Sequence, residues 1–147
     1  MIEFTSINEL LNKAKNLSDN IWKKSVDKSV KETIINLNTT DQLGSKGIDS
    51  LGDSLGEYAP FTVNLRLEKG LQVGHVDFKV TGKYWASWKI KVTESEIIIN
   101  VDESRFNELV NELRFSEEHV GLTDINFAIV KEMIRENYIK NARKQLL

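Results

Sequence analysis

The chain has 147 residues, of which 40% are hydrophobic and 29% are charged, and it contains no cysteine. This length and composition are typical of one globular domain with its own core, and the lack of cysteine excludes a disulfide framework, a thiolate metal site and a cysteine nucleophile. The net charge of −2 argues against a dedicated nucleic-acid-binding protein, because such proteins are normally basic.

We expect neither a membrane span nor a secretory signal in this sequence. It has no apolar run close to the roughly 20 residues that a membrane helix requires. The first residues, MIEFTSINELL, include Glu3 and lack the basic start of a secretory signal. We therefore expect a protein that works, or is assembled, in the cytoplasm.

The first 40 residues are predicted to be helical. A first helix is expected over residues 6–17, because its apolar residues recur at spacings of three and four and form one face: Ile7, Leu10, Leu11, Ala14 and Leu17. A second helix is predicted over residues 19–37 on the same pattern. The turn-forming residues 38–41 are expected to end it.

Residues 41–101 are predicted to form a glycine-rich loop and β region, with seven of the eight glycines between positions 44 and 92. Alternating apolar residues predict four strands, over residues 61–67, 76–80, 88–92 and 96–101. The last two are separated by a short turn, which predicts a hairpin. Between the second and third strands, Thr81-Gly82 is expected to open a short helical turn.

Residues 102–147 are again predicted to be helical. Asp102 is expected to start one helix, with Phe106 and Leu113 among its apolar residues, and Thr123 to cap a last helix that runs to about residue 142. The predicted fold is a single domain of the α+β class. In it, a small antiparallel sheet of about four strands is flanked by N-terminal and C-terminal helices.

Residues with catalytic or metal-binding chemistry do not occur in any recognisable spacing. His75 and His119 have no histidine or cysteine partner at ligand spacing. Residues 49–57 resemble a calcium loop but have leucines where oxygen ligands are needed. The glycines at 52 and 56 are not followed by the Lys-Ser/Thr of a phosphate-binding loop. We therefore expect no catalytic residue, no metal and no cofactor.

Two motifs of the middle region resemble a known family. The first is K-G-I-D-S-x-G-x-x-x-G-x-Y-x-P-x-T over residues 46–62, followed by Lys69-Gly70 and His75-Val76. The second is T-G-x-x-x-x-S-x-x-x-x-V over residues 81–92, and Gly121-Leu122-Thr123 comes later. In this order they resemble small virion-assembly proteins of tailed bacteriophages: neck, tail-completion (head-to-tail connector) or minor tail components, including those of Bacteroidetes and crAss-like phages.

The resemblance, which covers about residues 41–123, implies a structural role. It implies a subunit of a homo-oligomeric ring in the virion, at the junction between the portal vertex and the tail. The implied partners are copies of the same chain and the portal or other neck and tail proteins, with non-specific proximity to genomic DNA. It implies no catalysis, no cofactor and no membrane association.

Candidate interface residues are apolar or aromatic side chains in turn-rich surroundings and the bases of the last helix. They are Leu51, Leu55, Tyr58, Phe61, Tyr84, Trp85, Lys140, Arg143 and Lys144. For the aromatic residues the alternative is ordinary core packing. The last 17 residues hold five bases and two acids, a balance of +3, so the rest of the chain carries −5. An alternative function is therefore a nucleic-acid or host-factor binding module that uses the basic C-terminal helix.

Overall fold

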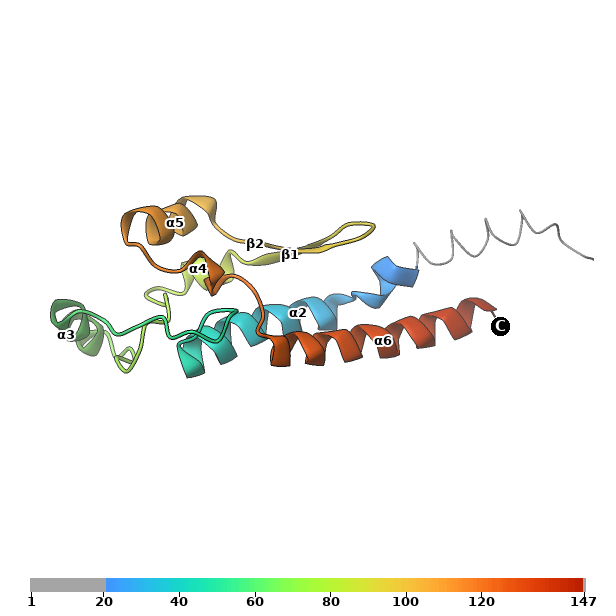
Figure 1. Ribbon diagram of the computed structural model, residues 1–147, viewed down its shortest axis with the longest axis horizontal. Helices are drawn as coiled ribbons and strands as arrows, with labels where there is room; N and C mark the ends of the chain where they lie inside the picture. The colour runs from blue at the N-terminus through green and yellow to red at the C-terminus, as the bar shows by residue number, and fades with distance from the viewer. Residues whose placement is uncertain (1–20, 147) are drawn as a thin grey trace, which may run out of the picture.

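The computed structural model describes residues 21–146, so the helix predicted over residues 6–17 lies outside the described residues. The described part is elongated and is organised around two long helical segments that lie side by side (Figure 1). The first consists of α2 (Lys28–Asn36) and its continuation η1 (Leu37–Lys46). The second is α6 (Asp124–Leu146).

The first helical segment is interrupted near its start. Residues 21–25 are helical, and α2 then begins after a cap at Asp27. The Asp27 carboxylate accepts a hydrogen bond from the Val30 N–H at 2.9 Å, which satisfies one of the free donors at the start of α2. The prediction of one continuous helix over residues 19–37 is wrong, because this aspartate starts a new helix inside that range.

The same segment continues farther than the sequence predicts. The turn-forming residues 38–41 do not end it but belong to η1, a π-helical stretch that ends at Gly47 with φ of +61°. A Cβ atom at Gly47 would lie 2.5 Å from the ring of His75, so this position requires glycine. The predicted end is wrong because the polar side chains of η1 find buried partners elsewhere in the chain.

Two side-chain amides of η1 bind the backbone before α6 in the way that a neighbouring strand would. Asn38 donates to the carbonyl of His119 at 2.9 Å and accepts from the N–H of Gly121 at 2.7 Å. Gln42 donates to the carbonyl of Gly121 at 2.8 Å and accepts from the N–H of Thr123 at 2.9 Å. Both amides are fully buried, and this pairing holds the start of α6 against η1.

The predicted hairpin is confirmed. β1 (Lys89–Val92) and β2 (Ile97–Asn100) pair antiparallel, with Ile90 opposite Ile99. Opposed residues of such a pair share one face of the hairpin. The apolar side chains of this face pack on a buried cluster from the two helical segments and the turn before α2, which consists of Val26, Val30, Ile34 and Val130.

The other two predicted strands are not present among the described residues. Residues 61–67 belong to a helix, α3 (Pro60–Glu68). Residues 76–80 are irregular, because Phe78 takes a φ of +59° and packs its ring edge-on against Phe115, with centroids 5.0 Å apart. Helices combined with a small antiparallel sheet are thus confirmed, but the sheet has two strands and not about four.

The sequence signals for two other helix starts are confirmed. α4 (Lys83–Ala86) follows Gly82, whose φ is +83°, as expected for the helical turn after Thr81-Gly82. The last helix, α6, begins after Thr123, whose hydroxyl accepts from the N–H of Asn126 at 3.3 Å. It extends four residues beyond its predicted end at about residue 142.

The chain between the hairpin and α6 forms three short helical pieces. α5 (Glu103–Asn107) starts, as predicted, at a cap in which the Asp102 carboxylate accepts from the N–H of Arg105 at 2.9 Å. It continues directly into η2 (Glu108–Glu112), a π-helical turn. A single 3₁₀ turn, η3 (Glu117–His119), follows before the chain reaches α6.

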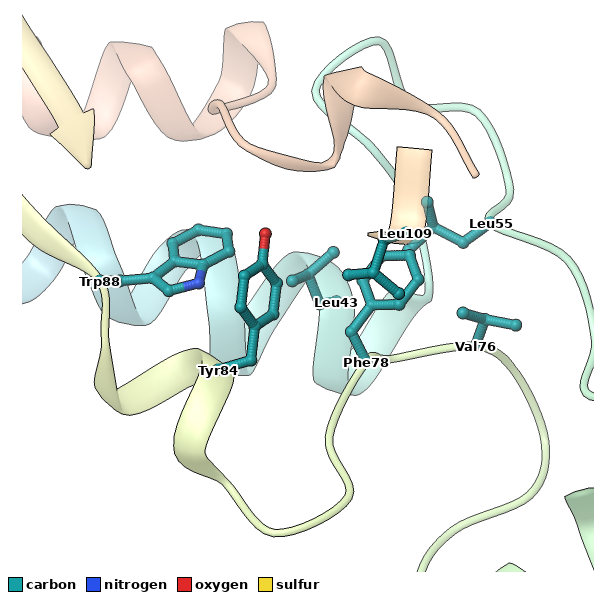
Figure 2. Packing of buried hydrophobic residues seen from close by; sticks show 7 residues of the cluster. All are labelled: Leu43, Leu55, Val76, Phe78, Tyr84, Trp88 and Leu109. Carbon is teal, nitrogen blue, oxygen red and sulfur yellow. The ribbon is translucent and has the colours of Figure 1, made fainter. Parts of the chain in front are cut away.

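Side chains from distant parts of the chain form the central core cluster, shown in Figure 2: Leu43, Leu55, Val76, Phe78, Tyr84, Trp88 and Leu109. The fully buried ring of His119 lies against this cluster, 4.8 Å from the Phe78 ring. His119 Nδ1 donates to the carbonyl of Ser116 at 2.6 Å, so Nε2 accepts from the Tyr84 hydroxyl at 2.7 Å. Burial lowers the pKa of His119, and the neutral ring serves as part of the core.

Candidate functional site

Helix α3 is bounded by a proline and a glycine. Pro60 occupies the first helical position, where its missing N–H removes no helical hydrogen bond. At the other end Gly70, with φ of +71°, donates to the carbonyl of Leu67 at 3.1 Å, and Leu71 donates to the carbonyl of Arg66 at 2.9 Å. These bonds form a Schellman motif, which ends the helix. The strand prediction is wrong here because the two end signals outweigh the apolar alternation between them.

The buried side chain of α3 is that of Arg66. One terminal nitrogen of its guanidinium lies 3.1 and 3.2 Å from the two carboxylate oxygens of Asp77. The other nitrogens donate to the carbonyls of Gln72 at 2.9 Å and Lys79 at 2.7 Å. The guanidinium also lies over the ring of Tyr58, 4.2 Å from the ring centroid. Arg66 therefore joins α3 to the irregular segment that follows it.

The carboxylate of Asp77 accepts several hydrogen bonds in addition to those from Arg66. It accepts from the Tyr58 hydroxyl, from the side-chain amide of Gln72 and from the N–H of Lys79, each at 2.8 Å. Burial raises the pKa of Tyr58, so its hydroxyl remains a donor. Both side chains of the ion pair are only 4% exposed, and this full set of hydrogen bonds offsets the cost of removing two charges from water.

Because an arginine anchors α3, its apolar side chains remain at the surface. Phe61 is 74% exposed, Leu67 is 58% exposed and Leu65 is 43% exposed. A helix of a soluble protein normally places such residues against the core and its charged residues in water. The arrangement of α3 is the reverse, and an exposed set of large apolar side chains is typical of a surface that binds a partner.

An apolar groove of about 470 Å³ opens beside α3, and we refer to it as the α3 groove. It is lined by Leu65 from α3, by Val80 from the irregular segment and by Leu113 at the end of η2. These three side chains are each between 43% and 53% exposed. Phe78 and Leu109 of the core cluster also line it, so the groove connects the surface of α3 to the core.

Some of the candidate interface residues lie in the core of the single chain. Leu55 and Tyr84 are buried members of the core cluster (Figure 2). Trp85 is half-buried, and its indole N–H donates to the carbonyl of Asp77 at 3.0 Å. Tyr58 is half-buried beneath the Arg66 guanidinium. Core packing thus accounts for Leu55 and Tyr84.

The remaining candidates are exposed, but they lie at separate places. Leu51 is 70% exposed in the loop before α3, and Phe61 is 74% exposed in the first turn of α3. The three bases are exposed near the C-terminal end of α6, which lies at the opposite end of the molecule from α3 (Figure 1): Lys140, Arg143 and Lys144. The structure therefore places Phe61 in α3 and Tyr58 just before it, beneath the Arg66 guanidinium, and it leaves the bases apart from them.

Tyr58 lines the α3 groove and is a candidate interface residue, but sequence reasoning missed the other residues that form this groove. The strand prediction places Leu65 on a buried face, and the helix prediction places Leu113 on the same side as Leu109. The spacing of Pro60 and Gly70 is the sequence signal that predicts a helix beside this groove. It marks a helix of about nine residues, in which alternating apolar side chains cannot all share one buried face.

The polar clusters of the described chain have structural partners. Buried Asp49, in the loop compared with a calcium site, accepts from the N–H groups of Leu51 and Asp53 at 2.9 Å and from the Ser116 hydroxyl at 3.1 Å. Within residues 21–146, no three histidine, cysteine, aspartate or glutamate side chains gather closely enough to hold a metal ion. In the same range, no helix has the length and apolar character needed to cross a bilayer.

Comparisons of the chain with protein-family models, with curated proteins and with solved structures give no match. The candidate functional site is therefore defined by geometry and exposure alone. It consists of the exposed apolar side chains of α3 together with the α3 groove. The chemistry of this site is that of an apolar binding surface.

Proposed function

We propose that the chain is a structural subunit of an oligomeric ring in the virion neck or tail of a tailed bacteriophage, where it joins the portal vertex to the tail. The observation that carries the proposal is the exposed apolar surface of α3 beside the α3 groove. An exposed apolar surface of this kind is typical of a site that binds another protein. In a ring of identical subunits, each subunit can cover this surface of its neighbour. The motifs in residues 46–62 and 81–92 support the assignment to a virion.

The proposed role is structural, with no catalytic residue, no metal and no cofactor. The proposed partners are copies of the same chain and the portal or other neck and tail proteins, with non-specific proximity to genomic DNA. The proposed location is the virion, after assembly in the host cytoplasm.

The oligomeric state of the full chain tests this proposal. We expect light scattering after size-exclusion chromatography to give a discrete multiple of the subunit mass, and electron microscopy to show closed rings. Phe61→Glu should reduce assembly, because it places a charge on the exposed face of α3. Ile125→Glu is a matched control, since Ile125 is 77% exposed on a different helix. A chain that stays monomeric over a wide concentration range contradicts the proposal.

A second candidate function is favoured by the exposed basic end of α6. Lys140, Arg143 and Lys144 all project into solvent there, and such a cluster suits the binding of nucleic acid or an acidic host factor. Fluorescence anisotropy with labelled duplex DNA in physiological salt separates the two functions. Submicromolar affinity, together with a monomeric chain, favours the nucleic-acid function over the ring.

A further inference from the structure

The proposed ring does not specify which part of a neighbouring chain fills the α3 groove. We propose that this groove binds residues 6–17 of a second copy of this chain, a proposal that rests on the proposed ring. Three steps lead to this occupant: the apolar pattern of that segment, the place where it joins the described chain, and the distance it can reach.

Residues 6–17 have the pattern that such a groove accepts. Their apolar residues fall at helical spacings and form one predicted face: Ile7, Leu10, Leu11, Ala14 and Leu17. An amphipathic helix binds an apolar groove by placing its apolar face in it, and its polar face remains in water. Glu57 and Lys69 flank the groove, and the segment carries Glu9 and Lys13, so charges of both signs are present on each side.

The segment joins the described chain at the start of the first helical segment. The helical turn of residues 21–25 lies at the end of that helical segment that is farther from α3 (Figure 1). Between this end and α3 run residues 21–46, which are helical except at the break before α2. With the usual rise of a helix, those residues cover roughly 35 Å, and α3 lies beyond the end of η1 (Figure 1).

The groove of the same chain is therefore out of reach for this segment. Residues 18–20 span at most about 10 Å when fully extended. The helix predicted over residues 6–17 would be about 18 Å long, so even if it ran back along α2 it would reach only about 28 Å from Ile21. Since this is less than the roughly 35 Å that residues 21–46 cover, residues 6–17 can reach an α3 groove only in a neighbouring chain.

Such a contact gives the assembly a definite direction. The N-terminal segment of one chain and the α3 groove of another are two different surfaces, so every contact of this kind is head-to-tail. Head-to-tail contacts generate a closed ring when the rotation between neighbours closes, and an open filament when it does not. In the proposed ring, residues 6–17 of each chain would therefore bind the α3 groove of the next chain.

Cysteine cross-linking of the full chain tests the contact, because the natural sequence contains no cysteine to give background. A Leu11→Cys chain is mixed with a Leu65→Cys chain and oxidised. We expect a disulfide-linked dimer with one chain of each kind. The control pair combines Leu11→Cys with Ile125→Cys, whose position is exposed and apolar but outside the groove, and we expect no link there.

A chain that carries both Leu11→Cys and Leu65→Cys should form a ladder of linked chains. A disulfide closed within one monomer overturns the proposal, because it places the segment in its own groove. Assembly without any link between positions 11 and 65 also overturns it, but leaves the proposed ring intact. Failure of the natural chain to assemble overturns both proposals together.

Complementary charge variants give a second readout that does not depend on disulfide geometry. Leu10→Glu disables the segment and leaves the groove intact, whereas Leu65→Glu disables the groove and leaves the segment intact. Each variant alone should lose assembly, and circular dichroism should show that both remain folded. Mixed together, they should form dimers of one chain each and nothing larger, since only one functional contact remains. Larger assemblies in the mixture contradict the head-to-tail contact.

Discussion

Arg66 and Asp77 determine which side of α3 faces the protein. Each charged group is buried, and each guanidinium nitrogen and each carboxylate oxygen of the pair has at least one hydrogen-bond partner. Two buried charges bonded to each other are stable together, but one of them left alone is strongly unfavourable. The two residues therefore act together. Loss of the pair would affect the position of α3 and of all the side chains that α3 exposes.

We expect Arg66→Met to lower the free energy of unfolding by about 3–5 kcal/mol, because it leaves the Asp77 carboxylate buried without its counter-charge. Urea unfolding followed by circular dichroism measures the change. Lys69→Met is the matched control, since Lys69 is exposed beside the same helix and its change should stay within about 0.5 kcal/mol. Equal effects of the two substitutions would show that the buried pair does not hold α3.

His119 should make the protein less stable in mild acid. Burial lowers the pKa of His119 below its ordinary value of 6.5. As the pH falls below that value, the unfolded chain takes up a proton that the folded chain does not, so the free energy of unfolding falls by up to about 1.4 kcal/mol per pH unit. The loss begins near the ordinary pKa and ends once the pH passes the lowered pKa of the folded state.

Urea unfolding at several pH values from neutrality downward measures this dependence. A His75→Gln chain should keep the decline that His119 causes, and NMR of the natural chain should show a His119 ring with its proton on Nδ1. A His119 ring that becomes protonated in the folded chain near its ordinary pKa would contradict the assignment.

At the scale of elements, the end of α3 depends on the backbone freedom of one glycine. Gly70 has φ of +71°, and nothing lies within 4 Å of the position that a Cβ would take, so Gly70→Ala introduces backbone strain without a clash. We expect a loss of about 1 kcal/mol in the free energy of unfolding. Gly74→Ala is the control, because Gly74 does not require positive φ and its Cβ would have room. Equal losses for both would show that the Schellman motif is not formed.

Elements with local signals could be predicted from the sequence. The hairpin, α4, α5 and the start of α6 each carry a turn, cap or alternation within a few residues, and the structure confirms them. η1 could not be predicted, because its polar residues are stabilised by backbone groups about 80 residues away, as Asn38 is by His119. Local propensity favours a turn at that position, and buried hydrogen bonds override it.

The candidate site could be predicted only in part for the same reason. Phe61 and Tyr58 stand out in the sequence as apolar or aromatic residues in a turn-rich region. The partner of Arg66 is Asp77, and nothing in the spacing of these two residues indicates that the arginine is buried. Without that contact, apolar alternation over residues 61–67 favours a strand with a buried face, so Leu65 is assigned to the interior.

At the scale of the whole molecule, the charged end and the apolar end are separate. The exposed bases of α6 lie at the opposite end from α3 (Figure 1), so each can be altered without direct effect on the other. This separation allows the contribution of charge to assembly to be measured independently of the apolar surface.

Replacing Lys140, Arg143 and Lys144 together by Glu should weaken assembly and leave the fold intact. The bases are exposed, so the free energy of unfolding should change little, whereas their attraction to an acidic neighbour should reverse. The difference between natural and variant chains should shrink as salt is added, because salt screens exposed charges beyond about 8–10 Å. Light scattering at low and high salt measures it. Normal assembly of the variant, with tight binding of duplex DNA by the natural chain, would favour the nucleic-acid function.

The buried anchor of α3 also affects how its surface changes over generations. Residues that hold the helix in place, such as Arg66, are different from those it displays, such as Phe61 and Leu65. A mutation at a displayed position leaves the anchor and its hydrogen bonds untouched. Selection can therefore exchange one displayed side chain for another and adapt the helix to a new neighbour, while the descendants keep the ancestral fold.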